Sequence, residues 1–269
     1  MLILLPPSEG KSNAARGRPM QPERLSSPIL QPARAQVLAA LVDLCTTVDP
    51  RTTVSAADLE RAVEVLRVGR TLSHEVARNA DLGTAHATRA DRVYTGVLYE
   101  ALDLTSLEGS ARRRATTWLA IVSGLFGLVR PGDHIAAYRL SGDVTLPGIG
   151  NVASFWREHL DQPIREAAGR GLVVDLRSST YATFWRPDPQ LAKRVVTVRV
   201  LHEVDGTRKV VSHFNKATKG RLVRNLLEDG GSPTSPKTFA AHLRSLGWDV
   251  EVGVPGRHGT ELDVVVSAL

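Results

Sequence analysis

The sequence predicts a mixed α+β protein of the α/β type, with a mixed central sheet surrounded by helices, and one domain over residues 1–269. Short β-rich runs occur at both ends of the chain and in its second half. Between them, apolar residues recur at helical spacing. No internal repeat, low-complexity tract or hinge-like linker divides the chain, so one globular unit is expected.

The opening run at residues 2–5 predicts a strand, and the proline-rich residues 13–34 predict a long ordered arm. Helical spacing predicts a helix over 32–48, a second that begins at Ser55, and further helices over 72–80, 89–102 and 107–128.

The second half of the chain has a different pattern, in which short strands alternate with helices. A short strand is expected within 171–178, after a helix that contains Phe155 and Trp156. Two β-branched runs over 194–214 flank Asp205-Gly206, which predicts a hairpin. Helices are expected over 216–228 and from Ser235-Pro236, and a last hairpin around 255–259.

Composition narrows the classes of protein to which the chain can belong. No apolar run approaches the roughly 18 residues that cross a bilayer, and the four-residue run at 2–5 is short for a signal peptide. The single cysteine, Cys45, provides no disulfide framework and no cysteine-based metal site. A cytoplasmic protein without a membrane partner is expected.

The net charge is +6 and the isoelectric point is near 9.8. A basic balance favours polyanionic partners such as nucleic acid, or anionic substrates. An arginine-rich composition also accompanies a GC-rich genome, so the charge alone does not choose between these explanations.

Gly10-Lys11-Ser12 after a strand resembles the end of a phosphate-binding P-loop, but the rest of that motif is missing. Leu5 stands where the first glycine belongs, and two prolines remove N–H donors from the loop. The remaining feature is a polar cluster of Ser8, Glu9 and Lys11 at the end of a central strand, where α/β proteins often place functional groups.

A second motif extends over residues 123–140, where glycines flank an apolar pair and basic residues follow. Gly124 and Gly127 have the spacing with which a helix-hairpin-helix element offers N–H groups to DNA, and Arg130, Tyr138 and Arg139 follow. The alternative is that these glycines only allow close packing against the sheet.

A third motif extends over 212–225 and places cations at the start of a predicted helix. Basic side chains beside free helix N–H groups predict an anion site, and an ordinary basic helix face is the alternative. The candidate residues are Ser212, Lys216, Lys219, Arg221 and Arg224.

Hydroxyl groups form a smaller cluster at another strand end, with Ser179 and Tyr181 after the strand and Tyr94 as a further candidate. The eight histidines have no spacing typical of a zinc site, so no metal and no cofactor are expected. No nucleophile elbow is present, and no catalytic triad can be assigned.

These motifs, in this order and over essentially the whole chain, resemble those of the YaaA family, also called DUF328 or UPF0246. The matching segments are LPPSEGK at the end of the first strand, VYTG at 93–96, SGLFGLVRPGD with YRL at 123–140, FW at 155–156, the Ser178–Tyr181 stretch, and VVSHFNKATKGRLVR. Enteric-type members read Ser-Pro-Ala-Lys in the first segment, whereas here Ser8 follows the prolines and Lys11 is displaced by two residues.

The resemblance implies a cytoplasmic peroxide-stress protein with a basic cleft and a helix-hairpin-helix element that binds DNA. In that case phosphates would contact Lys11, Arg130, Arg139 and the third motif, without base readout. The alternative is an enzyme for a small anionic or nucleotide-like substrate, with Ser8, Glu9, Lys11, Tyr94, Tyr138, Ser179 and Tyr181 as catalytic candidates. Convergence of these residues on one enclosed pocket favours the enzyme, and an open basic groove favours DNA.

Overall fold

The computed structural model describes residues 1–46, 56–69, 71, 73–204, 207–209 and 212–266. The α-helices are α1 (Gln31–Thr46), α2 (Ala56–Val65), α3 (Ser73–Ala80), α4 (Ala90–Val93), α5 (Val97–Leu102), α6 (Gly109–Trp118), α7 (Val152–Arg157), α8 (Asp161–Ala168), α9 (Ser179–Ala182), α10 (Pro189–Ala192), α11 (Ser212–Asp229) and α12 (Pro236–Ser245). Short 3-10 helices are η1 (Pro22–Arg24), η2 (Pro28–Leu30) and η4 (Leu104–Ser106).

The main sheet consists of β1 (Leu2–Leu5), β3 (Leu119–Ser123), β4 (Gly127–Val129), β8 (Val173–Asp175), β9 (Val195–Val204), β10 (Thr207–Lys209), β11 (Asp249–Gly256) and β12 (Gly259–Val266). Its order is β11-β12-β9-β8-β1-β3-β4, with β10 paired to β9. Two small ribbons pair β2 (Thr88–Arg89) with β5 (His134–Ile135), and β6 (Thr145–Leu146) with β7 (Gly150–Asn151).

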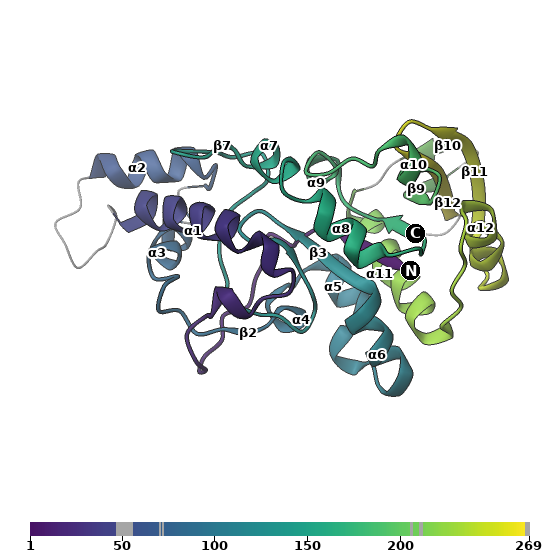
Figure 1. Ribbon diagram of the computed structural model, residues 1–269, viewed down its shortest axis with the longest axis horizontal. Helices are drawn as coiled ribbons and strands as arrows, with labels where there is room; N and C mark the ends of the chain where they lie inside the picture. Colours follow the sequence, from purple (N-terminus) through teal and green to yellow (C-terminus); the bar gives the residue numbers. More distant parts are fainter. Residues whose placement is uncertain (47–55, 70, 72, 205–206, 210–211, 267–269) are drawn as a thin grey trace.

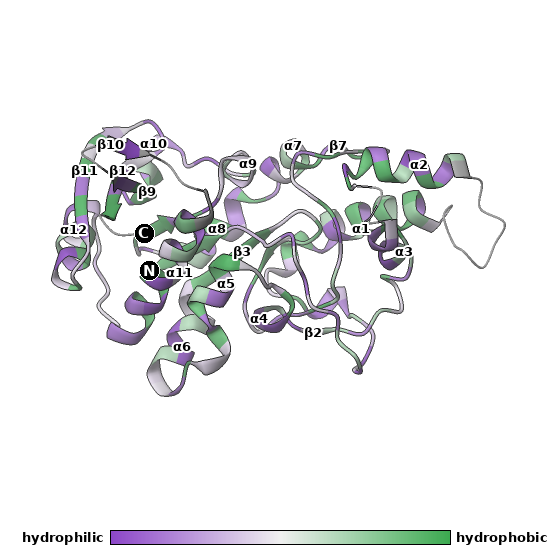
Figure 2. Cartoon of the chain, turned by 180° about the vertical axis from the view of Figure 1, so that it is seen from behind, coloured by the Kyte–Doolittle hydropathy of each residue, from purple (hydrophilic) through white to green (hydrophobic). Residues whose placement is uncertain are grey.

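The first strand lies at the middle of this sheet, between β8 and β3, and is parallel to both. Every residue of β1, β3 and β8 is buried, as expected for strands covered on both faces. Figure 2 shows β3 in the green of apolar residues at the centre of the molecule. The chain passes from β1 to β3 on one side and later to β8 on the other, which makes the carboxyl end of β1 a topological switch point.

The central strands β8, β1 and β3 lie between two peripheral groups of elements. Helices α1, α2 and α3 lie at one end of the long axis, and α12 with β9 to β12 lies at the other (Figure 1). Helix α11 packs against α5, and Gly220 permits the close approach because a Cβ there would collide with the Leu98 carbonyl. The mixed α/β class and the central mixed sheet are thus confirmed.

Most predicted elements are confirmed, including the strand at 2–5, the helix from Pro236 and the hairpin of β11 with β12. The runs expected to form the hairpin over 194–214 pair as β9 with β10, although the proposed turn at 205–206 lies outside the described residues.

The prediction of a continuous helix over 107–128 is wrong. Helix α6 ends at Trp118, and the chain then forms β3, a turn and β4. The run Leu119–Val122 is apolar at every position, and periodicity cannot distinguish a buried strand from a buried helix in such a run. The expected helix over 89–102 is likewise divided into α4 and α5 around Tyr94–Gly96.

Candidate functional site

The loop at the carboxyl end of β1 forms the centre of the candidate site. Residues 6–12 are fixed to the segment around α4 and α5: the Tyr99 hydroxyl donates to the Pro6 carbonyl at 2.6 Å, and the Thr95 N–H donates to Ser8 Oγ at 3.0 Å. Lys11 and Tyr94 form an isolated antiparallel bridge. The two prolines and these bonds give the loop a defined shape without the backbone cradle of a P-loop.

The Lys11 ammonium lies between aromatic rings and backbone carbonyls. Nζ donates to the Ser8 carbonyl at 2.7 Å and lies 4.4 Å from the ring centre of Tyr138 and 5.8 Å from that of Tyr94. Burial, and secondarily the positive charge of Arg139, lowers the pKa of Lys11 to about 7, although Glu75 and Glu9 act in the opposite direction. A substantial fraction of Lys11 is therefore a neutral amine near neutral pH.

A chain of hydroxyl groups lies beside Lys11. Tyr94 Oη is 3.2 Å from Tyr138 Oη, which in turn is 2.7 Å from Ser123 Oγ at the end of β3. Ser123 Oγ also accepts from the Phe126 N–H at 3.0 Å. Burial raises the pKa of both tyrosines far above the usual range, so they remain protonated hydrogen-bond donors.

Arg139 borders the same site and is only partly neutralised. Its backbone N–H donates to Asn79 Oδ1 at 2.8 Å, and Asn79 Nδ2 donates to its carbonyl at 2.7 Å. Its guanidinium is 3.4 Å from the Glu9 carboxylate, whose side chain is 80% exposed, and its buried Nε has no partner among the described residues. A long ion pair to so exposed a carboxylate contributes little, so Arg139 can accept another anion.

Two adjoining cavities open at this loop and share Pro7, Ser8, Glu9, Ser141 and Tyr181 as lining residues. The smaller, of about 30 Å³, reaches Lys11 and Arg139. The larger, of about 330 Å³, extends to Thr95–Tyr99, Ser178, Thr180 and Lys216. Together, these two cavities, hereafter the Lys11 pocket, are at the small end of the range for small-molecule sites.

Several predicted site residues are brought together here: Ser8, Glu9, Lys11, Tyr94, Tyr138, Arg139, Tyr181 and Lys216 line the Lys11 pocket or contact its lining residues. Ser179 begins α9, but its neighbours Ser178 and Thr180 line the cavity instead. Burial raises the pKa of Tyr181 as well, so its hydroxyl remains protonated.

Other predicted anion contacts have structural partners. Arg130 donates to the Thr117 and Leu119 carbonyls at the end of α6, and Arg224 donates to the Leu102 and Asp103 carbonyls. Lys219 donates to the Leu176 carbonyl at 3.2 Å. These three cations therefore hold elements together, and their expected contact with phosphate stays a prediction.

Gly124 and Gly127 are buried: Gly124 lies in the turn after β3 and Gly127 begins β4, so a strand hairpin stands where a helix-hairpin-helix turn was expected. The Gly124 carbonyl accepts from Trp156 Nε1 at 2.7 Å, and Gly127 has a φ of +70° with its Cα facing the Trp156 ring. Both glycines therefore serve close packing.

Two residues of the third motif remain. The Ser212 side chain lies outside the described residues, and Arg221 on α11 is exposed.

Sequence reasoning missed Asn79, Ser123 and the buried pair of Asp175 with Arg177. Arg177 contacts both Asp175 oxygens, at 2.9 and 2.6 Å, just beyond the end of β8. Burial opposes ionisation of Asp175, but Arg177 outweighs it and holds the pKa below its usual range. A buried asparagine within a polar helix such as α3 has no sequence pattern that marks it.

No helix within the described ranges combines the length and apolarity needed to cross a bilayer. Across those same residues, no three side chains of His, Cys, Asp or Glu come together as a set of metal ligands.

Comparison with known proteins identifies the family. The family model described as "Peroxide stress protein YaaA" matches residues 1–248. A UPF0246 protein of Streptomyces coelicolor is 50% identical, over 99% of this chain and 98% of the relative. A UPF0246 protein of Corynebacterium efficiens is 39% identical, over 94% and 95% respectively, and one of Shewanella loihica is 29% identical, over 74% and 77%. The chain belongs to the YaaA family of peroxide stress proteins.

Proposed function

We propose that this chain acts in peroxide stress as an enzyme on a small anionic substrate bound in the Lys11 pocket. The observation that carries the proposal is the setting of Lys11, an amine with a pKa of about 7 that contacts backbone carbonyls and a tyrosine ring. A lysine that is partly neutral at physiological pH can act as a general base or a nucleophile. Perturbed groups of this kind cluster at functional sites.

The neighbouring groups support an anionic substrate. Arg139 is bound only weakly to Glu9 and provides a planar fork for a carboxylate or phosphate. The protonated hydroxyls of Tyr181 and Ser141 line the same small cavity, and Lys216 adds a positive charge to the larger one. An anion bound to Arg139 would lie beside the Lys11 amine.

The test uses a bacterial strain that lacks its own YaaA protein and expresses variants of this chain during exposure to hydrogen peroxide. Lys11→Met and Lys11→Arg should both fail to protect, because neither provides a neutral amine near neutral pH. Lys237→Met, an exposed lysine on α12, should protect like the wild type. Protection by Lys11→Arg would mean that only a positive charge is needed, which would contradict the proposed catalytic role.

DNA binding is the second candidate, and the exposure of two cations on α11 favours it. Lys216 and Arg221 are both exposed, and the chain carries a net charge of +6. Contacts of such cations with DNA phosphates do not depend on the base sequence of the DNA. Each neutralised phosphate contributes about −0.9 to the slope of log affinity against log salt concentration. DNA contact through the backbone of Gly124 and Gly127 is not proposed, because both glycines are buried.

A salt-dependent titration with duplex DNA tests this second candidate. Lys216→Ala/Arg221→Ala should weaken binding and reduce the salt slope by about 1 to 2. The charge-matched control is Lys237→Ala/Arg257→Ala, two exposed cations at the α12 end of the molecule. An equal effect of both double variants would indicate a diffuse charge effect and would eliminate α11 as the DNA contact.

A further inference from the structure

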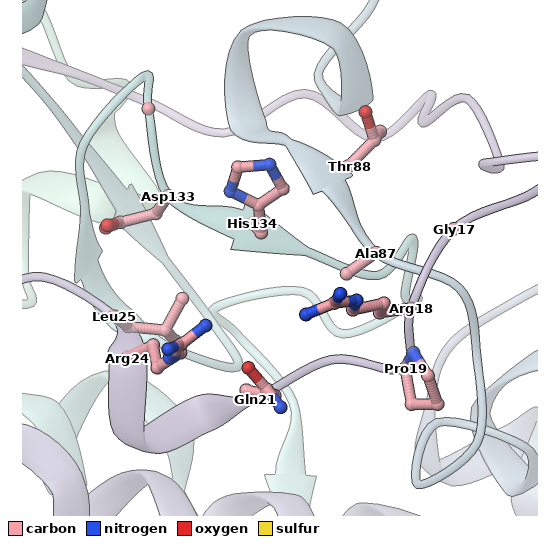
Figure 3. Close-up of a pocket in the computed structure, with 11 residues that line it drawn as sticks. Gly17, Arg18, Pro19, Gln21, Arg24, Leu25, Ala87, Thr88, Asp133 and His134 are labelled. Carbon is pink, nitrogen blue, oxygen red and sulfur yellow. The ribbon is translucent and has the colours of Figure 1, made fainter.

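A second cavity of about 420 Å³ lies apart from the Lys11 pocket and shares no lining residue with it. Its walls come from three segments: residues 17–25 of the N-terminal arm, Ala87–Thr88, and Gly132–His134. Figure 3 shows these segments around the opening, with Arg18 and Arg24 as the long side chains. This cavity is hereafter called the arginine cavity.

Backbone pairing fixes the walls of the arginine cavity. The Ala87 N–H donates to the Arg18 carbonyl at 3.0 Å, and the Met20 N–H donates to the Ala85 carbonyl at 3.2 Å. Strand β2 pairs with β5, which joins Thr88 to Ile135 across the ribbon. The proline-rich arm is therefore an ordered wall, and the cavity is formed before any ligand arrives.

Two guanidinium groups enter this cavity from opposite sides. Figure 3 shows Arg24 on one side and Arg18 on the other, with Gln21 and His134 between them on the lower and upper edges of the view. Neither guanidinium has a hydrogen-bond or ion-pair partner among the described residues, and both arginine side chains are exposed. Water screens the repulsion between these two exposed charges, and an anion between them would be attracted to both.

The carboxylate among the lining residues, that of Asp133, offsets at most one of the two arginine charges. Asp133 is buried, and one of its oxygens accepts from the Ser26 N–H and hydroxyl, at 3.0 and 2.8 Å. The other accepts from the Arg130 N–H at 2.8 Å. Its role is to hold the loop before β5, and the arginine cavity keeps a net positive lining.

We propose that the arginine cavity binds the phosphoryl group of a small molecule. Arginine presents a planar fork of donors that matches phosphate oxygens, and two arginines facing each other can bind a terminal phosphoryl group from both sides. The Thr88 hydroxyl, the Gln21 amide and the His134 ring add further polar groups, and Leu25 with Ala87 forms an apolar wall for the rest of the molecule. The volume lies within the usual range for small-molecule sites.

The shape favours a small molecule over a nucleic acid. Duplex phosphates are contacted by cations arrayed along an open surface, whereas here the two cations face each other across a concavity. A free phosphate, diphosphate or phosphoryl metabolite can enter such a space.

Calorimetric titration of the full chain with pyrophosphate tests the proposal. The wild type should bind, and Arg18→Gln and Arg24→Gln should each lower affinity about tenfold or more, as expected for a lost charge-assisted bond. Arg16→Gln is the matched control: Arg16 is exposed on the same arm and does not line the cavity, so its loss should change affinity little. Unchanged thermal unfolding of both cavity variants would show that they fold.

Three results would overturn the proposal: no binding by the wild type, retained affinity in both cavity variants, or an equal loss with Arg16→Gln. If malonate bound as tightly as pyrophosphate, the cavity would be a site for dianions in general and would not be specific for a phosphoryl group. If a short DNA duplex displaced pyrophosphate, Arg18 and Arg24 would be contacts for nucleic acid and not for a small molecule. Lys11→Met should bind pyrophosphate normally, which separates this proposal from the one made for the Lys11 pocket.

Discussion

The lowered pKa of Lys11 makes the free energy of unfolding of the chain depend on pH. This pKa is about 7 in the folded protein, against 10.5 for an ordinary lysine. Between these two values the unfolded chain binds more protons than the folded chain, so the free energy of unfolding rises with pH in this window. Below about pH 7 both states hold the proton, and this contribution no longer changes with pH.

The first prediction compares the wild type with Lys11→Met by urea unfolding at several pH values. From about pH 7.5 to pH 9.5, the wild-type free energy of unfolding should rise relative to that of the variant, by at most about 1.4 kcal/mol per pH unit. The variant serves as the reference because all other titrating groups are shared. Parallel curves for the two proteins would mean that Lys11 keeps an ordinary pKa and would remove the basis of its catalytic role.

A second residue-scale prediction concerns Cys45, which is fully buried on α1. Burial raises the pKa of its thiol to about 12, although a hydrogen bond with Asn79 acts in the opposite direction. Because the thiolate is the reactive form, iodoacetamide should leave Cys45 unmodified in the folded chain at neutral pH. Mass spectrometry should find complete modification in denaturant, and equal rates in both states would contradict the burial.

The candidate site could be predicted in part because polar residues that end a buried strand stand out in a sequence. Ser8, Glu9 and Lys11 were found in this way, and the structure places them at the central strand's carboxyl end. Arg130 and Arg224 were assigned to an anion site because the sequence does not reveal which carbonyls a guanidinium will meet. Their partners lie where α6 meets β3 and at the end of α5, and only the folded chain brings them together.

At the scale of elements, the strands and hairpins with alternating patterns were predicted well, and the uniformly apolar run 119–122 was not. Strand β9 alternates between buried and more exposed residues from Val198 onward, whereas β3 is buried throughout. A strand in the middle of a parallel sheet has no exposed face and therefore no alternation. Alternation therefore does not mark the central strands, and the equally buried β1 was predicted from its short apolar run instead.

The turn between β3 and β4 gives an element-scale prediction. Gly127 has a φ of +70°, and a Cβ there would lie 2.6 Å from a Trp156 ring atom. Gly127→Ala should therefore incur backbone strain of about 1–2 kcal/mol and a further cost of about 1–3 kcal/mol from overpacking.

Gly148→Ala is the matched control for this substitution, since Gly148 has a φ of +76° but no described atom lies within 4 Å of the place that an added Cβ would occupy. It should incur only the backbone strain. Urea unfolding of both variants separates the two contributions, and equal losses would show that the contact with Trp156 relaxes without cost.

At the scale of the whole molecule, the Lys11 pocket draws on residues from 6 to 216, so it depends on the packing of almost the entire chain. The loop after β1, the segment around Tyr94, the chain from Tyr138 to Ser141, helix α9 and helix α11 all contribute. Their meeting point is the carboxyl edge of a sheet whose central strand is the first element of the chain. A loss of sheet packing should therefore disrupt the pocket as a unit.

The last prediction concerns whether helices α1 to α3, at one end of the molecule, unfold together with the sheet. Leu41 on α1 is fully buried in the same apolar cluster as β1, so Leu41→Ala should cost about 2–5 kcal/mol. The four tryptophans are at positions 118, 156, 185 and 248, outside these helices, so their fluorescence reports on the rest of the molecule. In a single domain, Leu41→Ala should lower the urea midpoint of tryptophan fluorescence as much as that of circular dichroism. If only the circular dichroism transition moved, the helices would form a separate folding unit, and the single domain over residues 1–269 would be wrong.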